Sequence, residues 1–529
     1  MPDASEVYKK PFLYKTQTPG HDALIKGGHL VKPAEEKKVR VKQDADYLFH
    51  ELTRSICPEC KTVIDAQILI QDNKVLMRKR CPEHGWFTGI ISSDAKMYVD
   101  SVKFNKPGTI PLEFSTEVKD GCPLDCGLCP EHKQHICLAL IEVNTACNLN
   151  CPICFANAGV GFSLTTEQVE FMIDRFVETE GDPEVIQFSG GEPTIHPDLM
   201  EMIQAARDRG IRQVMINTNG VRIARDDKFL DELAKQNPVI YFQFDGLRPE
   251  TYVTIRGEDL LELKLKALDR LAEKGMDAVL VAAIERGVNT DEVGAILKFG
   301  LEHPAVRGVV FQPVTHVGRH IDFDPMERVT IPDVIHGIVD QSDGRFILED
   351  FVPVPCCFPT CQVNSYVFVD GENTVPLPRM LDIDKYLDYI TNRALPKPTN
   401  SKDVQEALEK LWSASAVPGS EETAGQFQCA CGPGMELGYE LSHLKDHIFQ
   451  IAIKDFLDPW TFNVKQVMKC CVGILVPDGR IIPFCAYNSV GYREEIRDQL
   501  ASEQKLENAR KKIALAAKIN SGTPAPADD

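Results

Sequence analysis

Short apolar runs alternate with amphipathic stretches through the middle of the chain. Residues 138–143 (LALIEV) form a run typical of a buried strand, and residues 165–180 follow with helical spacing. The same alternation predicts further strands at 185–188, 214–217, 239–244, 278–284 and 309–312, and further helices at 197–209, 227–235, 259–274 and 291–302. Six strands that alternate with helices predict an α/β fold of parallel units with right-handed crossovers. We expect these units to form a partial, TIM-like (β/α)6 barrel with its active site at the carboxyl ends of the strands.

The regions on both sides of this barrel are rich in cysteine. We expect a small rubredoxin-like or zinc-ribbon-like domain before the barrel, and a region that carries auxiliary clusters and covers the substrate after it. The expected divisions are an arm at 1–45, a metal-knuckle domain at 46–110, an auxiliary-cluster loop at 111–137, the barrel at 138–345, the C-terminal region at 346–520 and a disordered tail at 521–529. Within the C-terminal region, residues 396–420 are rich in proline, serine and glycine, which predicts a surface excursion.

Charge and length exclude several classes of protein. The chain has 529 residues and a formal net charge of −20, which argues against a nucleic-acid partner and against attraction to anionic membranes by bulk charge. The polar N-terminus shows no secretory signal, and no apolar run reaches the length of a transmembrane helix. We therefore expect a cytoplasmic protein, with peripheral membrane contact as an alternative.

The chain holds 18 cysteines, and they fall in groups. Grouped cysteines without an export signal are typical of metal ligands rather than of disulfides. The groups are Cys57/Cys60/Cys81, Cys122/Cys126/Cys129/Cys137, Cys147/Cys151/Cys154, Cys356/Cys357/Cys361, Cys429/Cys431 and Cys470/Cys471/Cys485.

One cysteine group lies directly after the first predicted barrel strand, in the sequence NTACNLNCPICF at 144–155. Three thiolates with CxxxCxxC spacing can bind three irons of a [4Fe–4S] cubane. The fourth iron stays open to the amino and carboxylate groups of a small molecule. No fourth protein ligand is nearby, which disfavours a zinc site. With this loop the chain resembles the radical S-adenosylmethionine (SAM) superfamily, and Cys147, Cys151 and Cys154 are the expected cluster ligands. Residues 144–155 are therefore named the SAM loop.

The resemblance extends to motifs at the ends of the later strands. The sequence GGEP at 190–193 resembles the superfamily motif that receives the methionine part of SAM, and Glu192 is expected to accept its ammonium. The other contacts to SAM that the resemblance implies come from the strand ends and from an IRG sequence. The complete set of expected SAM-binding residues is Gly190, Gly191, Glu192, Pro193, Asn217, Asn219, Asp245, Arg256, Ile284 and Gln312.

The resemblance also implies the chemistry. A reduced cluster cleaves SAM to methionine and a 5′-deoxyadenosyl radical, which takes hydrogen from an unactivated carbon, while the protein positions the reactants and excludes water. The electron is expected from a donor such as ferredoxin or flavodoxin.

Two knuckles before the barrel predict a mononuclear metal site. CPEC at 57–60 and CPEH at 81–84 supply Cys57, Cys60, Cys81 and His84. Paired knuckles of this kind hold one tetrahedral metal, and this ligand set suits zinc or mononuclear iron.

The remaining cysteines predict one or two auxiliary [4Fe–4S] clusters. Cys122, Cys126 and Cys129 repeat the CxxxCxxC spacing but follow no strand, and Cys137, His132, a distant cysteine or no residue completes their site. Adjacent side chains diverge on an extended chain, so one cysteine of each adjacent pair is expected to be a buried thiol. The C-terminal residues expected to bind metal are Cys356, Cys361, Cys429, Cys431, Cys471 and Cys485.

Taken together, the cysteine motifs resemble those of one subgroup, which includes the archaeal tetraether lipid synthases and the class D radical SAM methylases. The synthase resemblance implies C–C bond formation between isoprenoid lipid tails, and this is the primary functional prediction. The methylase resemblance implies methylation of a pterin-like heterocycle with a folate-type one-carbon donor. A small polar pocket would favour methylation, and a long apolar tunnel would favour lipid joining. A non-catalytic iron–sulfur electron carrier and a peptide-modifying enzyme are the remaining alternatives.

Overall fold

The computed structural model describes residues 25–26, 29–30, 45–159, 161–370, 373–379 and 447–520. Most of the expected N-terminal arm, the surface excursion at 396–420, the tail at 521–529, and Cys429 and Cys431 lie outside the described residues.

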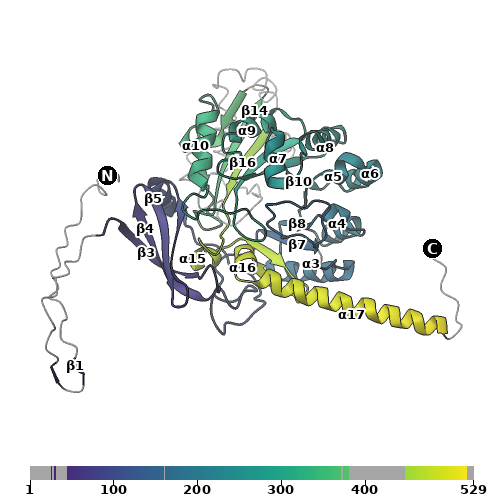
Figure 1. Cartoon of the computed structure of the whole chain (residues 1–529). Coiled ribbons are helices and arrows are strands. Elements are labelled where there is room, and N and C mark those ends of the chain that lie inside the picture. The colour runs from purple at the N-terminus through teal and green to yellow at the C-terminus, as the bar shows by residue number, and fades with distance from the viewer. Residues whose placement is uncertain are drawn as a thin grey trace, which may run out of the picture.

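A single large sheet forms the body of the molecule (Figure 1). All six predicted strands are present, and they lie side by side in chain order and in parallel, which confirms the barrel-like α/β core. Their bounds are β7 Leu138–Asn144, β8 Val185–Gly190, β9 Gln213–Thr218, β10 Val239–Gln243, β11 Ala278–Ile284 and β12 Val306–Pro313.

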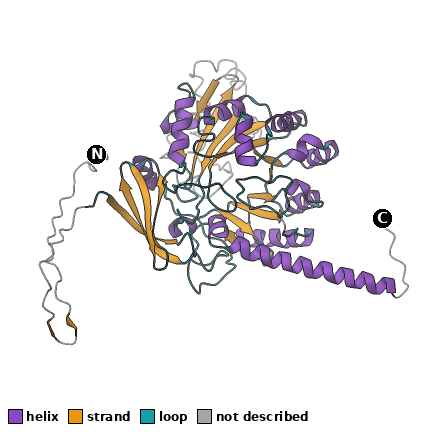
Figure 2. Cartoon of the chain, in the orientation of Figure 1, coloured by secondary structure: helices purple, strands orange, loops and turns teal. Residues whose placement is uncertain are grey.

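Helices cover the outer face of this sheet (Figure 2). The five predicted helices are confirmed, and α3 begins with a capping box in which Thr165 and Gln168 satisfy each other's backbone N–H groups. Their bounds are α3 Thr166–Glu180, α4 Leu199–Asp208, α6 Asp227–Gln236, α8 Leu261–Glu273 and α9 Val293–Glu302. Shorter helices between them are α5 Val221–Arg225 and α7 Pro249–Arg256, and α10 Ile331–Gln341 follows β12.

The sheet is wider than six strands, because the C-terminal region extends it at both edges. β16 (Ile448–Lys454) pairs in parallel with β12, and β17 (Val472–Leu475) pairs in parallel with β7. The full sheet has 12 strands in the order β13-β14-β16-β12-β11-β10-β9-β8-β7-β17-β18, with β15 paired to β14. The C-terminal region therefore builds part of the barrel wall. Its other elements are β13 Val352–Pro353, β14 Gln362–Asp370, β15 Asn373–Pro376, β18 Ile481–Pro483, α15 Val464–Val467, α16 Phe484–Ser489 and α17 Tyr492–Asn520.

A separate antiparallel sheet lies before the barrel, in the region predicted to carry the metal knuckles. Its strands follow the order β3-β4-β5-β6, and the helix α2 (Ala95–Asp100) comes after them. The strand bounds are β3 Leu48–Ile56, β4 Val63–Gln71, β5 Lys74–Cys81 and β6 Gly85–Ser92. A two-stranded pair, β1 Ile25–Lys26 and β2 His29–Leu30, precedes this sheet.

The barrel strands alternate between two environments. On β8, Ile186 and Phe188 are fully buried in the core, whereas Gln187 and Ser189 line a cavity on the other face. Because side chains alternate across a strand, the same period of two sets the lining of this cavity on the neighbouring strands. No helix in the described part of the chain is long and apolar enough to cross a bilayer.

Candidate active site and metal centres

A cavity of about 330 Å³ lies inside the curved sheet, next to the SAM loop. Its volume is in the range of small-molecule sites. All three cysteines of the SAM loop line it, together with the glycines of the GGEP motif and inward-facing residues of nine strands. The expected site residues that line this cavity are Cys147, Cys151, Cys154, Gly190, Gly191, Asn217, Asn219, Arg256 and Gln312.

Backbone N–H groups point at the sulfur atoms of the SAM loop. Leu149 N–H donates to Cys147 Sγ at 3.4 Å, and Ala158 N–H donates to Cys154 Sγ at 3.4 Å. Burial raises the pKa of Cys147 to about 11, and the Leu149 N–H opposes this shift. Since N–H donors stabilise thiolates, the loop fits the three-thiolate cluster that the sequence predicts.

The two glycines of the GGEP motif pack directly against the backbone of the SAM loop. A Cβ atom on Gly191 would lie 2.1 Å from the carbonyl oxygen of Ala146, and one on Gly190 would lie 2.2 Å from that of Asn144. Gly190 also has a φ of +126°, a conformation that side chains rarely adopt. These glycines therefore set the position of the loop that leads into Cys147.

Glu192 has a different environment from the predicted one. Its side chain is 1% exposed, does not line the cavity, and accepts hydrogen bonds from the backbone N–H groups of Thr194 (3.1 Å) and Asn219 (2.8 Å). The hydroxyl groups of Thr194 and Thr218 also donate to it, at 2.6 and 2.7 Å. Burial raises the pKa of Glu192, and these donors oppose the shift. The carboxylate therefore fixes the turn that carries Asn219.

Replacing Glu192 with glutamine is expected to destabilise the protein by about 1–3 kcal/mol, because the amide NH₂ must face a backbone N–H whichever way it points. Chemical unfolding would measure this. The exposed Glu201, replaced with glutamine on α4, is the matched control, with an expected change within about 0.5 kcal/mol. Equal stability of the two variants would contradict the assignment.

Asp245 likewise does not line the cavity. It is fully buried and forms a two-point ion pair with Arg256, with Nε and Nη2 each 2.7 Å from a carboxylate oxygen. The backbone N–H of Ala283 donates to the same carboxylate at 3.1 Å. Burial raises the pKa of the Cys151 thiol, and the nearby Arg256 guanidinium opposes this shift. Asp245 therefore positions the cation beside Cys151.

The other predicted SAM contacts divide into two sets. Asn219 donates from Nδ2 to Asn148 Oδ1 at 2.7 Å, with Cys147 Sγ 3.9 Å away, so it joins the third strand to the SAM loop. Gln312 lines the cavity and donates to Tyr241 Oη at 2.9 Å. Pro193 and Ile284 are buried, and neither is part of the cavity lining, so the structure does not place them at the SAM site.

The two knuckles form a four-ligand group. Nδ1 of His84 lies 3.6 Å from Cys57 Sγ and 3.5 Å from Cys81 Sγ, and Cys60 Sγ lies 3.9 Å from Cys81 Sγ. Zinc bonds of about 2.3 Å to sulfur and 2.0–2.1 Å to nitrogen place tetrahedral ligands about 3.5–3.8 Å apart. All four ligand atoms lie within 4.8 Å of one another, so the geometry fits one tetrahedral metal.

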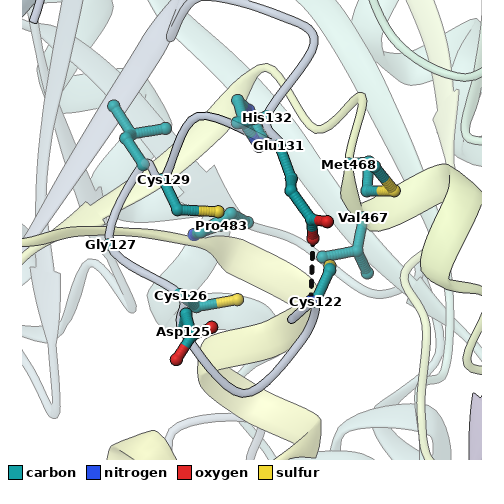
Figure 3. A pocket seen from close by; sticks show the side chains of 11 residues that line it. Cys122, Asp125, Cys126, Gly127, Cys129, Glu131, His132, Val467, Met468 and Pro483 are labelled. Atoms are coloured by element: carbon teal, nitrogen blue, oxygen red, sulfur yellow. Dashed lines mark hydrogen bonds between the residues drawn. The ribbon is translucent and has the colours of Figure 1, made fainter. Parts of the chain in front are cut away.

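Cys122, Cys126 and Cys129 face a common hollow, as Figure 3 shows. Val467, Met468 and Pro483 of the C-terminal region close its other side. His132 is buried there, and its Nε2 donates to the carbonyl oxygen of Cys470 at 2.9 Å. Burial lowers the pKa of His132 to about 4, which keeps the imidazole neutral.

Cys137 lies with two cysteines of the C-terminal region. This position disfavours Cys137 as the fourth ligand of the group of Cys122, Cys126 and Cys129. The sulfur atom of Cys137 lies within 4.8 Å of those of Cys356 and Cys471, and all three residues are buried. The neighbours Cys357 and Cys470 are not members of this group. Cys361 and Cys485 are also buried, and the ammonium of Lys454 lies 2.9 Å from Cys361 Sγ.

Two features of the site are absent from the sequence-based prediction. Gly318 and Arg319 hold the end of the SAM loop, with two backbone hydrogen bonds between Arg319 and Cys154 at 2.8 and 3.0 Å. A Cβ on Gly318 would lie 2.5 Å from the carbonyl oxygen of Cys154. The second feature is a set of polar side chains that point into the cavity. On the strands, the sequence signal for them is a polar residue at an inward-facing position, every second residue of a buried strand. The residues are Glu142, Gln187, Gln243, Gln362, Gln450 and Lys454 on the strands, and Arg493 outside them.

Comparison with known proteins agrees with this geometry. Residues 141–300 match the radical SAM superfamily, and residues 49–93 match the HMPTM N-terminal zinc ribbon domain, which favours zinc at the knuckles. The 7,8-dihydro-6-hydroxymethylpterin dimethyltransferase of Methanocaldococcus jannaschii is 36% identical over 485 residues, which cover 85% of this chain and 95% of that protein. The GTP 3′,8-cyclase of Chlorobaculum tepidum is 33% identical over 177 residues, covering 33% of this chain and 53% of that protein.

Among solved structures, Streptococcus suis SuiB bound to S-adenosylmethionine matches with 17% identity and a TM-score of 0.34, covering 40% of this chain and 47% of that one. The M. jannaschii relative, by contrast, aligns over nearly its whole length. The chain therefore belongs to the radical SAM superfamily and, within it, to the family of the 7,8-dihydro-6-hydroxymethylpterin dimethyltransferase.

Proposed function

We propose that this radical SAM enzyme methylates a pterin-like heterocycle. The family relationship supports methylation over the lipid-joining reaction that was the primary prediction from the sequence. The observation that carries the proposal is a set of seven amide side chains among the residues that line the cavity. They are Gln187, Gln243, Gln312, Gln362, Gln450, Asn217 and Asn219.

The lining discriminates between the two substrate classes through the cost of desolvation. Each amide offers two donors and an acceptor, and a buried polar group left without a partner costs about 1–3 kcal/mol. A lipid tail has no polar atoms, so it would leave the remaining hydrogen-bond donors and acceptors of several amides without partners. A heterocycle with ring nitrogens, an amino group and a carbonyl can satisfy them. The hydrogen-bonding capacity of the wall therefore favours a pterin-like substrate.

Different residues of the chain would bind the cluster, position the SAM loop and orient the substrate. Cys147, Cys151 and Cys154 would hold the cluster, which supplies the electron that cleaves SAM when both are bound. Arg256 and Asn219 hold the SAM loop in place, and the amide wall orients the heterocycle so that one C–H bond faces the SAM side of the cavity. We propose that the hydrogen atom of that C–H bond would pass to the carbon radical derived from SAM, and that a folate-type donor would release its one-carbon unit to the substrate carbon. A low-potential reductant such as ferredoxin or flavodoxin would supply the electrons, and solvent the protons, that bring this unit to the methyl level.

We further propose that Cys137, Cys356 and Cys471 bind one auxiliary [4Fe–4S] cluster and that Cys122, Cys126 and Cys129 bind another. Three buried sulfur atoms within 4.8 Å support the first site, and the shared hollow supports the second. The first of these clusters would lie close to the barrel wall, because Cys471 and Cys137 directly precede the paired strands β17 and β7.

The decisive experiment is substrate-dependent SAM cleavage. The reconstituted, anaerobic protein is incubated with SAM, a reductant and a methylene-carrying tetrahydrofolate, in the presence of 7,8-dihydro-6-hydroxymethylpterin or of a diether lipid. We expect the pterin to raise 5′-deoxyadenosine formation above background and to gain mass in whole methyl groups, whereas the lipid does neither. Stimulation by the lipid together with a cross-linked product would overturn the proposal.

A further inference from the structure

Arg493 is a buried cation whose hydrogen bonds are only partly used. Its side chain lines the cavity, the residue is 5% exposed, and Nη2 lies 2.7 Å from Glu142 Oε1. Within the described residues, its Nε and Nη1 have no hydrogen-bond partner. A buried N–H without an acceptor costs about 1–3 kcal/mol, so two of them on a cavity wall indicate the place of an acceptor atom on a ligand.

Glu142 lies beside this cation on the same wall. One carboxylate oxygen accepts from Arg493, and the other accepts from Tyr487 Oη at 3.0 Å. A carboxylate offers about four acceptor sites, so this one retains capacity for further N–H groups. The wall therefore presents acceptors next to donors.

This arrangement matches one edge of a pterin. The pyrimidine ring of a pterin carries an amino group on C2, an N–H at N3 and a carbonyl on C4, in that order. Glu142 can accept from the two N–H positions, and Arg493 can donate to the carbonyl oxygen. A free carboxylate, such as that of SAM, would also suit Arg493, but the adjacent Glu142 would repel it. The pair therefore favours a neutral edge that offers both donors and an acceptor.

Aromatic side chains of the same cavity suit the flat faces of such a ring. The rings of Phe155 and Phe484 are stacked, with their centroids 5.2 Å apart, and the ring centroid of Phe456 lies 4.6 Å from that of Phe484. All three line the cavity. Apolar ring faces with a polar edge at one end are the features expected of a site for a planar heterocycle.

We propose that Glu142 and Arg493 together recognise the 2-amino-4-oxo edge of the pterin and set its orientation. This inference rests on the proposed function, and it adds the residues that select the substrate. Glu142 and Arg493 are specificity-determining residues in this scheme, and Tyr487 is a positioning residue that orients Glu142.

The test compares Glu142→Gln, Arg493→Lys and Tyr487→Phe with the wild-type holoenzyme. The matched control is Glu495→Gln, at an exposed position of α17, the helix that carries Arg493. Binding of 7,8-dihydro-6-hydroxymethylpterin is followed by fluorescence titration, and binding of SAM by equilibrium dialysis. We expect E142Q and R493K to weaken pterin binding by about tenfold to a hundredfold, and Y487F to weaken it less. The control variant should bind both ligands as the wild type does, and all the variants should bind SAM within about twofold of the wild type, the change that 0.4 kcal/mol produces.

A change in the ligand removes the dependence on variant folding. The analogue in which a carbonyl replaces the 2-amino group should bind the wild-type protein at least about tenfold more weakly, because its oxygen faces the Glu142 carboxylate. In E142Q, whose amide can donate, this discrimination should shrink or reverse.

The outcomes separate the two proposals. If the wild-type protein does not bind the pterin, the proposed function and this inference both fail. If it binds the pterin and E142Q and R493K bind it equally well, this inference alone is overturned. A parallel loss of SAM affinity would also overturn it, because the pair would then belong to the SAM site.

Discussion

Replacing Cys147, Cys151 and Cys154 together with alanine is expected to lower SAM cleavage by more than about a thousandfold, because the electron that breaks SAM comes from the cluster these thiolates hold. The iron content should fall by about four per chain. Any zinc bound by Cys57, Cys60, Cys81 and His84 should be unchanged, since that group belongs to the separate β3–β6 sheet. Quantifying 5′-deoxyadenosine, iron and zinc in the same preparation checks all three expectations.

The matched control for this prediction is the alanine triple variant of Cys122, Cys126 and Cys129, which have the same spacing. We expect it to lose a similar amount of iron but to keep measurable cleavage of SAM in the absence of substrate. If the activities of the two triple variants were reversed, the radical would originate at the Cys122 group. The assignment rests on position in the fold, because the SAM loop follows β7 and packs against Gly190 and Gly191.

The barrel core was predictable because its signal is local. Each strand from β7 to β12 is a short apolar run between helices with their own caps, so propensity and pattern agree within a few residues. The parallel pairing of two further strands with this core was missed for the opposite reason. β16 and β17 pair with β12 and β7 across more than a hundred residues of chain, and nothing in residues 448–454 indicates that partner.

The same pairing explains where Cys137 lies. Val472, the first residue of β17, pairs with Leu138, the first residue of β7. Cys471 and Cys137 each lie one residue before these strands, so they come together. The backbone N–H of Cys137 donates to the carbonyl oxygen of Cys471 at 2.9 Å. Cys137 is close to the Cys122 group in the sequence, but this strand pairing places it with Cys356 and Cys471. Sequence spacing cannot show this, because it depends on the register of a long-range strand pair.

Glu192 and Asp245 show a second limit of sequence reasoning. Both lie at strand ends, where superfamily contacts to SAM are expected, but position along the chain does not determine where a side chain points once the strand has ended. β10 ends at Gln243, and the irregular backbone that follows turns Asp245 toward Arg256. Within the strands the period of two holds, and the inward Gln187 and Gln243 could have been read from it.

Replacing Arg256 with methionine is expected to cost about 3–5 kcal/mol, because it leaves the fully buried Asp245 carboxylate without its counter-ion. The double variant Asp245→Asn/Arg256→Met should recover about 2 kcal/mol or more of that loss, since the charge itself is then gone. Anaerobic guanidinium unfolding of the wild type, both single variants and the double variant measures the coupling. Lys96→Met, at an exposed ion pair with Asp100, is the surface control and should cost less than about 1 kcal/mol.

The same cycle separates a structural role of Arg256 from a role at the cluster. A purely structural pair predicts that the double variant regains iron content along with stability. Arg256, however, also lies next to the Cys151 thiol and opposes the rise in the pKa of that thiol. We therefore expect the double variant to regain stability while its cluster stays more easily lost to chelators than that of the wild type. Full recovery of both properties would show that the cation serves only Asp245, whereas recovery of stability alone would show that one guanidinium holds the barrel together and stabilises the thiolate that binds iron.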